Sequence, residues 1–243
     1  MNWIVCRVNR TRGAISGWLL RAPRSRAILA AVRLKERLAF WRQSQHQFES
    51  TGAIQPSSRF LARAMTEPLR LERGADPVRV VEMGPGTGAV TRVIATALRS
   101  HDHLDCVEIN PEFARYLREL IDRETAFDGA RERIDVHVGD AREIRLAGHA
   151  DFVICSVPLN NLPVEAASAI LASGVELLGG HGWFTYFEYV GLPRLRKVTA
   201  PTTERDRLDG VRAAKAAFAA GRARSRIVWR NLPPARAVHV LVD

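Results

Sequence analysis

Short apolar runs alternate with longer amphipathic stretches along most of the chain. Runs of about four to eight apolar residues predict buried strands, whereas apolar residues three or four apart over a longer stretch predict helices. Strands are predicted over residues 78–83, 104–109, 134–138, 150–155, 183–190, 226–229 and 237–242. Helices are predicted over residues 59–65, with a serine as N-cap, and over 89–98, 111–122, 164–178 and 204–220. This alternation predicts an α/β fold with a mostly parallel seven-stranded sheet and helices on both faces.

Residues 26–48 form a further predicted helix, with an apolar stripe bordered by cations. Leu34, Leu38, Trp41 and Phe48 fall on one face at helical spacing, and lysine and arginine side chains flank that face on both sides. Such a helix resembles one that lies in a lipid interface. The pattern also fits a helix that packs on its own domain and turns its arginines to water, so both interpretations stay open.

The positive charge of the chain is concentrated at its N-terminus. The chain has 36 Lys and Arg against 26 Asp and Glu, a formal net charge of +10. Residues 1–48 hold ten bases and one acid, a balance of +9, and the rest holds 26 bases and 25 acids, a balance of +1. A positive field at one end favours an anionic partner, either a membrane surface or nucleic acid. We therefore predict a basic N-terminal extension over residues 1–48 and a main domain over residues 49–243.

Other features of the composition exclude several classes of protein. The apolar runs are shorter than the roughly 18 residues of a membrane span, so no transmembrane helix is expected. The three cysteines are far apart and the seven histidines show no ligand spacing. We therefore expect neither a disulfide scaffold nor a metal site. A reducing, cytoplasmic location fits this cysteine usage, with peripheral attachment to the membrane through the basic extension.

A glycine-rich loop follows the first strand of the main domain. Gly84, Gly86 and Gly88 stand in a Gly-x-Gly-x-Gly pattern, with Thr87 inside it, and a predicted helix begins directly afterwards. Glycine lets a ligand approach the backbone without interference from a Cβ atom, and the helix N-terminus supplies amide donors. The loop alone is a weak signal, because glycine turns also serve as simple connections.

An acidic residue stands at the end of each of the first three strands. Glu82 directly precedes the glycines, Glu108 ends the second strand and Asp140 follows the third. A carboxylate at the end of the second strand can accept both hydroxyls of a ribose. A nicotinamide-binding domain is the alternative interpretation of this loop, but such domains usually space their glycines as Gly-x-Gly-x-x-Gly.

The loop and the three acids together resemble the class I S-adenosylmethionine-dependent methyltransferases, over residues 77–190. The resemblance implies a Rossmann-like fold with S-adenosyl-L-methionine as cofactor. It implies contacts of Glu82 with the methionine ammonium, of Glu108 with the ribose, and of Asp140 with the adenine. The residues expected to bind the cofactor are Ser57, Ser58, Glu82, Gly84, Gly86, Thr87, Gly88, Glu108, Ile109, Asp140, Ala141 and Ser156.

Four stretches resemble the bacterial phospholipid N-methyltransferases, which methylate phosphatidylethanolamine. They are residues 51–59, 82–88, 157–163 and the terminal Trp-Arg-Asn-Leu-Pro-Pro-Ala of 229–235. The third departs from the Ser-Gly-Leu-Pro that is common in that family, so the amino-lipid is open between phosphatidylethanolamine and ornithine lipid. The resemblance implies an enzyme that acts on a membrane amino-lipid at an anionic membrane surface, without an obligate protein partner.

The loop after the fourth strand weighs against a nucleic acid substrate. Adenine-N6 and rRNA dimethyladenosine methyltransferases carry an aromatic residue there, which stacks on the target base. This chain has Leu159 at that position, so a flipped base would lose its stacking partner. An rRNA or tRNA adenine methyltransferase stays the main alternative, and a cofactor-binding protein without turnover is a third.

Transfer of a methyl group to an amine sets the expected chemistry of the acceptor site. The enzyme mainly aligns the reactants and excludes water, and the amine must lose a proton before it can attack. Asn160 and Asn161 offer carbonyl oxygens that could orient the amine. Glu188, Tyr186 and Tyr189, at the end of the fifth strand, are the candidate proton acceptors.

Overall fold

The computed structural model describes residues 57–191, 201–220 and 223–243. All of them belong to one compact unit, Trp41–Asp243. The predicted basic extension over residues 1–48, with its apolar stripe, lies outside the described residues. Its boundary and its membrane role therefore stay predictions.

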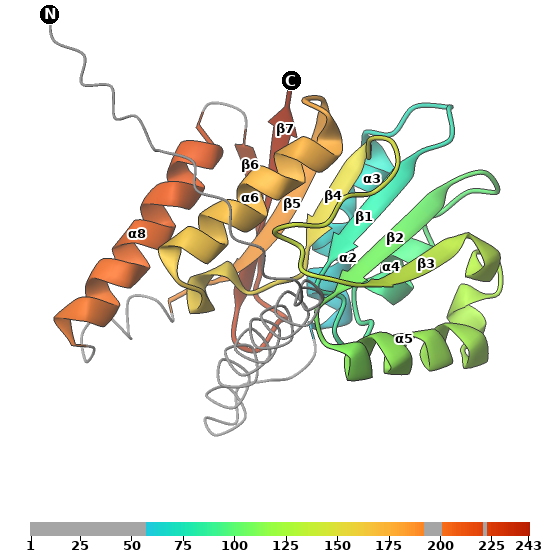
Figure 1. The fold of residues 1–243 in the computed structure, drawn as a ribbon, viewed down its shortest axis with the longest axis horizontal. Coiled ribbons are helices and arrows are strands. Elements are labelled where there is room, and N and C mark those ends of the chain that lie inside the picture. Colours follow the sequence, from blue (N-terminus) through green and yellow to red (C-terminus); the bar gives the residue numbers. More distant parts are fainter. Residues whose placement is uncertain (1–56, 192–200, 221–222) are drawn as a thin grey trace, which may run out of the picture. The chain divides into compact units, whose positions relative to one another are not determined.

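A seven-stranded sheet forms the centre of the described residues (Figure 1). Its order in space is β3-β2-β1-β4-β5-β7-β6. The first five strands pair in parallel, while β7 is antiparallel to both β5 and β6. The prediction of a mostly parallel seven-stranded sheet is therefore confirmed. The strands are β1 (Arg79–Met83), β2 (His103–Glu108), β3 (Ile134–Val138), β4 (Phe152–Cys155), β5 (Gly182–Tyr189), β6 (Ala223–Val228) and β7 (Ala235–Val242).

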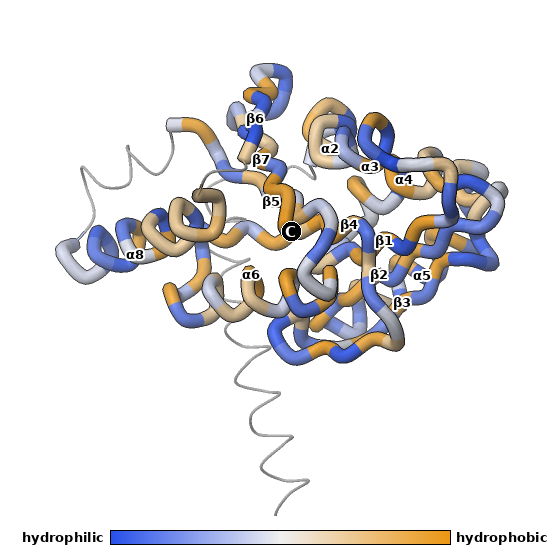
Figure 2. The backbone as a smooth tube through the Cα atoms, turned by 90° about the horizontal axis from the view of Figure 1, so that it is seen from above, coloured by the Kyte–Doolittle hydropathy of each residue, from blue (hydrophilic) through white to orange (hydrophobic). Residues whose placement is uncertain are grey.

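Helices cover both faces of the sheet, as predicted. One apolar cluster joins α2 (Arg59–Met65), α3 (Glu67–Leu71), α4 (Thr91–Ala95) and α5 (Pro111–Arg123) to one face. A second cluster joins α6 (Val164–Leu178) and α8 (Thr202–Phe218) to the other. Figure 2 shows α2, α3 and α4 on one side of the strands and α6 on the opposite side. None of the described helices has the length and apolar character needed to cross a bilayer.

Local sequence signals account for several helix ends. Ser58 caps α2, because its hydroxyl accepts a hydrogen bond from the Leu61 amide at 3.2 Å. Asn110 caps α5 in the same way, with Pro111 at the first helical position. The helix predicted over residues 89–98 is shorter in the structure, where α4 is followed by irregular turns. Helix α3 was not predicted, since its five residues are too few to show a period.

The order of the strands creates a crevice at one edge of the sheet. Strands β1 and β4 are neighbours, yet the chain leaves β1 toward α4 on one face and leaves β4 toward α6 on the other. Ligands of open α/β sheets bind outside the carboxyl ends of the strands at such a switch point. The residues singled out in the sequence follow these carboxyl ends.

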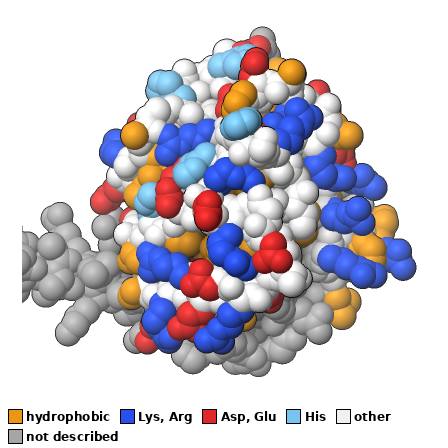
Figure 3. Space-filling model, turned by 90° about the vertical axis from the view of Figure 1, so that its right-hand side faces the viewer, with side chains coloured by type: hydrophobic (Ala, Val, Ile, Leu, Met, Phe, Trp, Pro, Cys, Tyr) orange, Lys and Arg blue, Asp and Glu red, His pale blue; other side chains and the backbone are white. Residues whose placement is uncertain are grey.

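A polar network covers the part of the sheet next to β3 that no described helix overlies. Asp105 on β2 accepts hydrogen bonds from Arg79 Nε and from His137 Nε2, each at 2.7 Å. His103 lies 3.3 Å from Asp135 on β3. Figure 3 shows histidines among mixed charges on this side of the molecule. His103, Asp105 and Asp135 are close enough together to share a metal ion, but Arg79 already neutralises Asp105, so we assign them a structural role.

Candidate functional site

The glycine loop has the conformation and the free space that a bound ligand needs. Gly84, Gly86 and Gly88 all have positive φ, at 71°, 54° and 79°. A Cβ atom on Gly84 would lie 2.5 Å from Val157 Cγ2, so the loop packs directly on the segment after β4. A Cβ atom on Gly86 would meet nothing within 4 Å. The middle of the loop therefore faces open space, while its first glycine fixes it to the sheet.

Glu108 lies beneath this loop with its carboxylate oriented by backbone amides. Its Oε2 accepts a hydrogen bond from the Gly86 amide at 3.1 Å, and its Oε1 accepts one from the Asn110 amide at 2.9 Å. Burial raises the pKa of Glu108, and the amide hydrogen bonds oppose that rise. A carboxylate has about four acceptor sites, so these bonds leave Glu108 capacity to accept from a ligand hydroxyl.

Glu82 is fully buried and connects two elements of the site. Its Oε2 accepts a hydrogen bond from the Thr91 hydroxyl of α4 at 2.6 Å, and its Oε1 accepts one from the Ser156 hydroxyl after β4 at 2.9 Å. Burial raises the pKa of Glu82 to about 7, against the lowering effect of both hydrogen bonds. The predicted cofactor residue Ser156 thus acts on Glu82 in this structure.

Asp140 and Ala141 follow β3 at the same edge of the sheet. The amide of the preceding Gly139 donates to the Glu108 carbonyl at 3.0 Å, so Asp140 lies beside the end of β2. Asp140 Oδ2 accepts a hydrogen bond from Arg142 Nη2 at 2.6 Å. Sequence reasoning missed this arginine, although its place two residues after the acid was a readable signal.

Of the other predicted cofactor residues, Ile109 and Thr87 adjoin these acids, whereas the hydrogen bonds of Ser58 go to other elements. Ile109 is the buried residue after Glu108, and Thr87 is exposed between two glycines of the loop. Ser58 is committed to α2, and its amide donates to Asn231 Oδ1 at 3.0 Å. In the described part of the chain, no hydrogen bond joins Ser57 or Ser58 to the glycine loop.

A buried lysine brings together two residues of the predicted acceptor site. Lys215 of α8 is 4 % exposed. Its Nζ donates to Asn160 Oδ1 at 2.7 Å and to Glu188 Oε2 at 2.5 Å, and it lies 6.0 Å from the centre of the Tyr186 ring. We call Lys215, Asn160, Glu188 and Tyr186 the ammonium cluster. Lys215 was missed in the sequence, where its only signal was a lone cation among the alanines of a predicted helix.

The alternation of side chains along β5 separates the two predicted tyrosines. Tyr186 packs with the cluster that contains α6 and α8, whereas Tyr189 packs with the cluster on the other face and meets the Phe187 ring at 5.5 Å. The structure therefore does not bring Tyr189 to Lys215. Burial, together with the charge of Glu188, raises the pKa of Tyr186 well above its usual range. Tyr186 thus stays protonated at neutral pH and cannot serve there as the proton acceptor.

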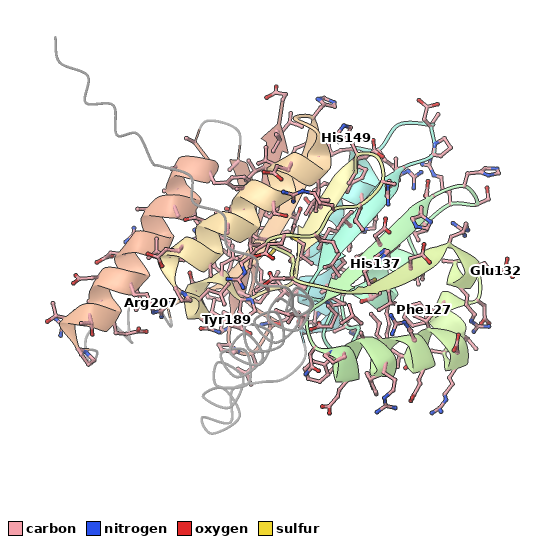
Figure 4. All side chains as sticks on the ribbon, in the orientation of Figure 1. Phe127, Glu132, His137, His149, Tyr189 and Arg207 are labelled. Carbon is pink, nitrogen blue, oxygen red and sulfur yellow. The ribbon has the colours of Figure 1, made fainter. Side chains whose placement is uncertain are left out.

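Helix α8 also fixes the loop after β4 through Arg207. Its Nη1 donates to the backbone carbonyls of Asn160 at 3.0 Å and Leu162 at 2.6 Å. The Asn161 amide donates to the Pro158 carbonyl at 2.9 Å and closes a 3₁₀ turn, η3 (Leu159–Asn161). Figure 4 marks Arg207 on α8 and Tyr189 on β5. Sequence reasoning assigned no role to Arg207, because its partners are backbone atoms distant in the chain.

Comparison with known proteins agrees with this fold. A family model described as a methyltransferase domain matches residues 80–182. The O-methyltransferase TomG from Streptomyces achromogenes, solved in complex with SAM, has a similar structure, with a TM-score of 0.54 and 18% identity over 76% of this chain and 79% of that one. The chain belongs to the class I S-adenosylmethionine-dependent methyltransferases.

Two curated relatives have names that include a methyl acceptor. The ornithine lipid N-methyltransferase of Singulisphaera acidiphila is 30% identical over 138 residues, which are 54% of this chain and 67% of that protein. The probable ribosomal RNA small subunit methyltransferase A of Haloarcula marismortui is 40% identical over 96 residues, which are 39% of this chain but only 29% of that protein. The two relatives have different substrates by name, so membership of the class leaves the acceptor open.

The residues of the site fit the cofactor of this class, S-adenosyl-L-methionine. The open space at Gly86 and the acceptor capacity left on Glu108 suit a ribose, and the ionised form of Glu82 suits an ammonium group nearby. Asp140, with the Ala141 amide, would hold the adenine. When bound, the cofactor supplies an electrophilic methyl group.

Proposed function

We propose that the protein is an N-methyltransferase that acts on the amine of a membrane amino-lipid, either ornithine lipid or phosphatidylethanolamine. The observation that carries this proposal is the ammonium cluster, where Asn160 Oδ1 and Glu188 Oε2 converge on one primary ammonium. An amino-lipid head group carries the same kind of donor, and its amine would share these two oxygens with Lys215. The ornithine lipid N-methyltransferase among the relatives supports the same class of substrate.

The position of the cluster also supports the proposal. The segment after β4 contacts the glycine loop through Val157 and reaches the cluster through Asn160. An amine bound there would lie at the end of the segment that borders the cofactor loop, and Asn160 would orient it. We assign cofactor binding to the glycine loop and the three acids, and amine binding to the cluster.

Removal of the amine's proton falls to Glu188 in this scheme. It is the carboxylate of the ammonium cluster, and its Oε2 would take the proton from the amine. Lys215 Nζ, 2.5 Å away, is already an ammonium, so it orients this carboxylate and takes no proton from it; the proton leaves Glu188 to solvent. Arg236, 3.5 Å from Glu188 Oε1, keeps the carboxylate at the site. Tyr186, which stays protonated, contributes its ring beneath the cation.

Methylation of adenine in rRNA is the second candidate, favoured by the relative from Haloarcula marismortui. Against it stands Leu159, which occupies the place of the base-stacking aromatic residue. Leu159 is buried in the apolar cluster under α6 and presents no flat face to a flipped base. We therefore rank the amino-lipid first.

Lipid mass spectrometry tests the proposal. The gene would be expressed in a bacterium that makes both amino-lipids but no methylated ones, beside a Glu108→Ala variant as a control for cofactor-dependent activity. We expect methyl-group mass increments on ornithine lipid or phosphatidylethanolamine in the wild type alone. Unchanged lipids, together with new dimethyladenosine in the rRNA, would overturn the proposal in favour of the second candidate.

A further inference from the structure

The turn between β6 and β7, residues 229–234, exposes two large apolar side chains. Trp229 is 70 % exposed and Leu232 is 77 % exposed. We call residues 229–234 the β6–β7 tip. A single apolar residue at the surface needs no explanation, but two within four residues on one turn form a local apolar surface.

The β6–β7 tip is held in place by a buried asparagine. Asn231 is 5 % exposed, its Nδ2 donates to the Pro233 carbonyl at 2.7 Å, and its Oδ1 accepts from the Ser58 amide at 3.0 Å. The Val190 amide donates to the Pro234 carbonyl at 2.8 Å. The hydrogen bonds that satisfy Asn231 thus fix a turn whose neighbouring side chains, Trp229 and Leu232, point into solvent. Two of the sequence stretches that resemble phospholipid N-methyltransferases, 51–59 and 229–235, meet at the Ser58–Asn231 contact.

Two cations belong to the same region: Arg230 is part of the tip, and Arg59 follows Ser58, which binds Asn231. The guanidinium groups of Arg59 and Arg230 lie 5.0 Å and 4.5 Å from the centre of the Phe60 ring. In the part of the chain that the structure describes, neither arginine forms an ion pair with a carboxylate. Their charges are therefore available to an anionic partner. Apolar side chains next to unpaired cations are the combination that suits an anionic lipid interface.

The β6–β7 tip lies at the same edge of the sheet as the acceptor site. Strand β7 starts where β5 ends, with Ala235 opposite Tyr189, so the tip borders the carboxyl end of β5. Glu188, one residue before that end, belongs to the ammonium cluster. Arg236, just beyond the tip, lies 3.5 Å from Glu188 Oε1. A bilayer in contact with the tip would therefore present its head groups to the edge where the cluster lies.

We propose that the β6–β7 tip docks on an anionic bilayer surface, with Trp229 and Leu232 in the lipid interface and Arg59 and Arg230 on lipid phosphates. This inference rests on the proposed function, and it adds a lipid contact within the main domain. The docked tip holds the carboxyl edge of the sheet against the membrane, so the head group reaches the ammonium cluster without leaving the bilayer.

Vesicle flotation of the full chain tests the docking. The test variant is Trp229→Ser with Leu232→Ser, and the matched control is Leu71→Ser. Leu71 is 66 % exposed at the end of α3, where the adjacent Glu72 pairs with Arg224 at the start of β6, the opposite edge of the sheet. On vesicles of phosphatidylethanolamine and phosphatidylglycerol we expect the double variant to partition about tenfold less, or about 1.4 kcal/mol, and the control to match the wild type.

Two further measurements separate the possible outcomes. Arg59→Gln with Arg230→Gln should weaken binding to anionic vesicles and reduce its salt dependence, with little change on phosphatidylcholine vesicles. All variants should keep wild-type affinity for S-adenosylmethionine, which shows that they are folded. Equal flotation of the wild type and the Trp229/Leu232 variant would overturn the docking. Light scattering adds a further outcome. If the wild type is a dimer and the Trp229/Leu232 variant is a monomer with unchanged flotation, the docking is overturned in favour of a contact between two copies of the chain.

Activity distinguishes failure of the docking from failure of the proposed function. With the tip docked, the Trp229/Leu232 variant should lose activity on vesicle lipid and keep it on a short-chain, water-soluble amino-lipid analogue. Equal activity of variant and wild type on vesicles would refute the docking while the function stands. If the wild type methylates neither substrate, the proposed function fails, and flotation alone still decides whether the tip binds lipid.

Discussion

Replacement of Glu82 by glutamine should stabilise the cofactor-free protein in a way that depends on pH. Glu82 is fully buried between Thr91 and Ser156, and burial raises its pKa to about 7 from an ordinary 4.5. Because the folded state binds the proton more tightly than the unfolded state, ionised Glu82 destabilises the fold increasingly as the pH rises above 4.5. Glutamine keeps hydrogen bonds to both hydroxyls, which can donate or accept, and it carries no charge.

The size of the effect follows from the two pKa values. With about 7 in the folded state and 4.5 in the unfolded state, ionisation of Glu82 costs about 3 kcal/mol at pH 8 and about 1 kcal/mol at pH 5. The free energy of unfolding of Glu82→Gln should therefore exceed that of the wild type by an amount that grows by about 2 kcal/mol between these pH values. The cost would be retained in the natural sequence because the ionised carboxylate suits an ammonium group of the cofactor.

Urea unfolding without cofactor, at pH 5, 6.5 and 8, measures this difference. Calorimetry at pH 8 should show weaker S-adenosylmethionine binding by the same variant. Glu124→Gln is the control, because the pKa of Glu124 is shifted in the opposite direction: a hydrogen bond from Arg92 lowers it. Removal of the Glu124 charge should therefore not increase the free energy of unfolding at pH 8. A stability difference that is the same at all three pH values, or a variant less stable than the wild type at pH 8, would refute the reasoning.

Three further substitutions test other parts of the structure. Glu108→Ala should weaken S-adenosylmethionine binding roughly tenfold to hundredfold in calorimetry, since unpaired buried hydroxyls cost about 1–3 kcal/mol; unchanged affinity would contradict its assignment. Asn160→Ala should lower turnover on the lipid far more than cofactor affinity, whereas wild-type turnover would reduce the loop after β4 to a connector. Asp102→Asn should lower the free energy of unfolding at pH 7 by about 3–5 kcal/mol, because it leaves the buried Arg73 without its partner. Burial alone would raise the pKa of Asp102, but Arg73 and the amides of Arg99 and Val78 lower it to about 2. This difference in unfolding free energy should therefore persist above pH 3.8 and shrink as the pH falls toward 2.

The strands and the three acids were predictable because both depend on local patterns. An apolar run shows a buried parallel strand directly, and an acid at its end must lie at the carboxyl edge once the strands are parallel. Glu82, Glu108 and Asp140 could therefore be placed on one edge without knowledge of any contact. The helix ends at Ser58 and Asn110 followed from capping chemistry in the same way.

The partners of those residues were not predictable, because they come from elements far apart in the chain. Lys215 reaches Asn160 across 55 residues, and Ser58 reaches Asn231 across 173. A helix pattern predicts the face that α8 buries but not which strand end lies under it. The aromatic residues near the end of β5 illustrate the same limit. Their alternation was visible in the sequence, but the choice of the face toward α8, which separates Tyr186 from Tyr189, depends on packing.

The segment after β4 physically joins the two halves of the site. Ser156 donates a hydrogen bond to Glu82, Val157 packs on Gly84 of the glycine loop, and Asn160 accepts a hydrogen bond from Lys215. Arg207 fixes the backbone of the same segment through two carbonyls. Any shift that opened the ammonium cluster would therefore move atoms that contact the cofactor loop. Because these contacts lie within the seven residues from Ser156 to Leu162, binding at one half of the site can influence the other without a large rearrangement.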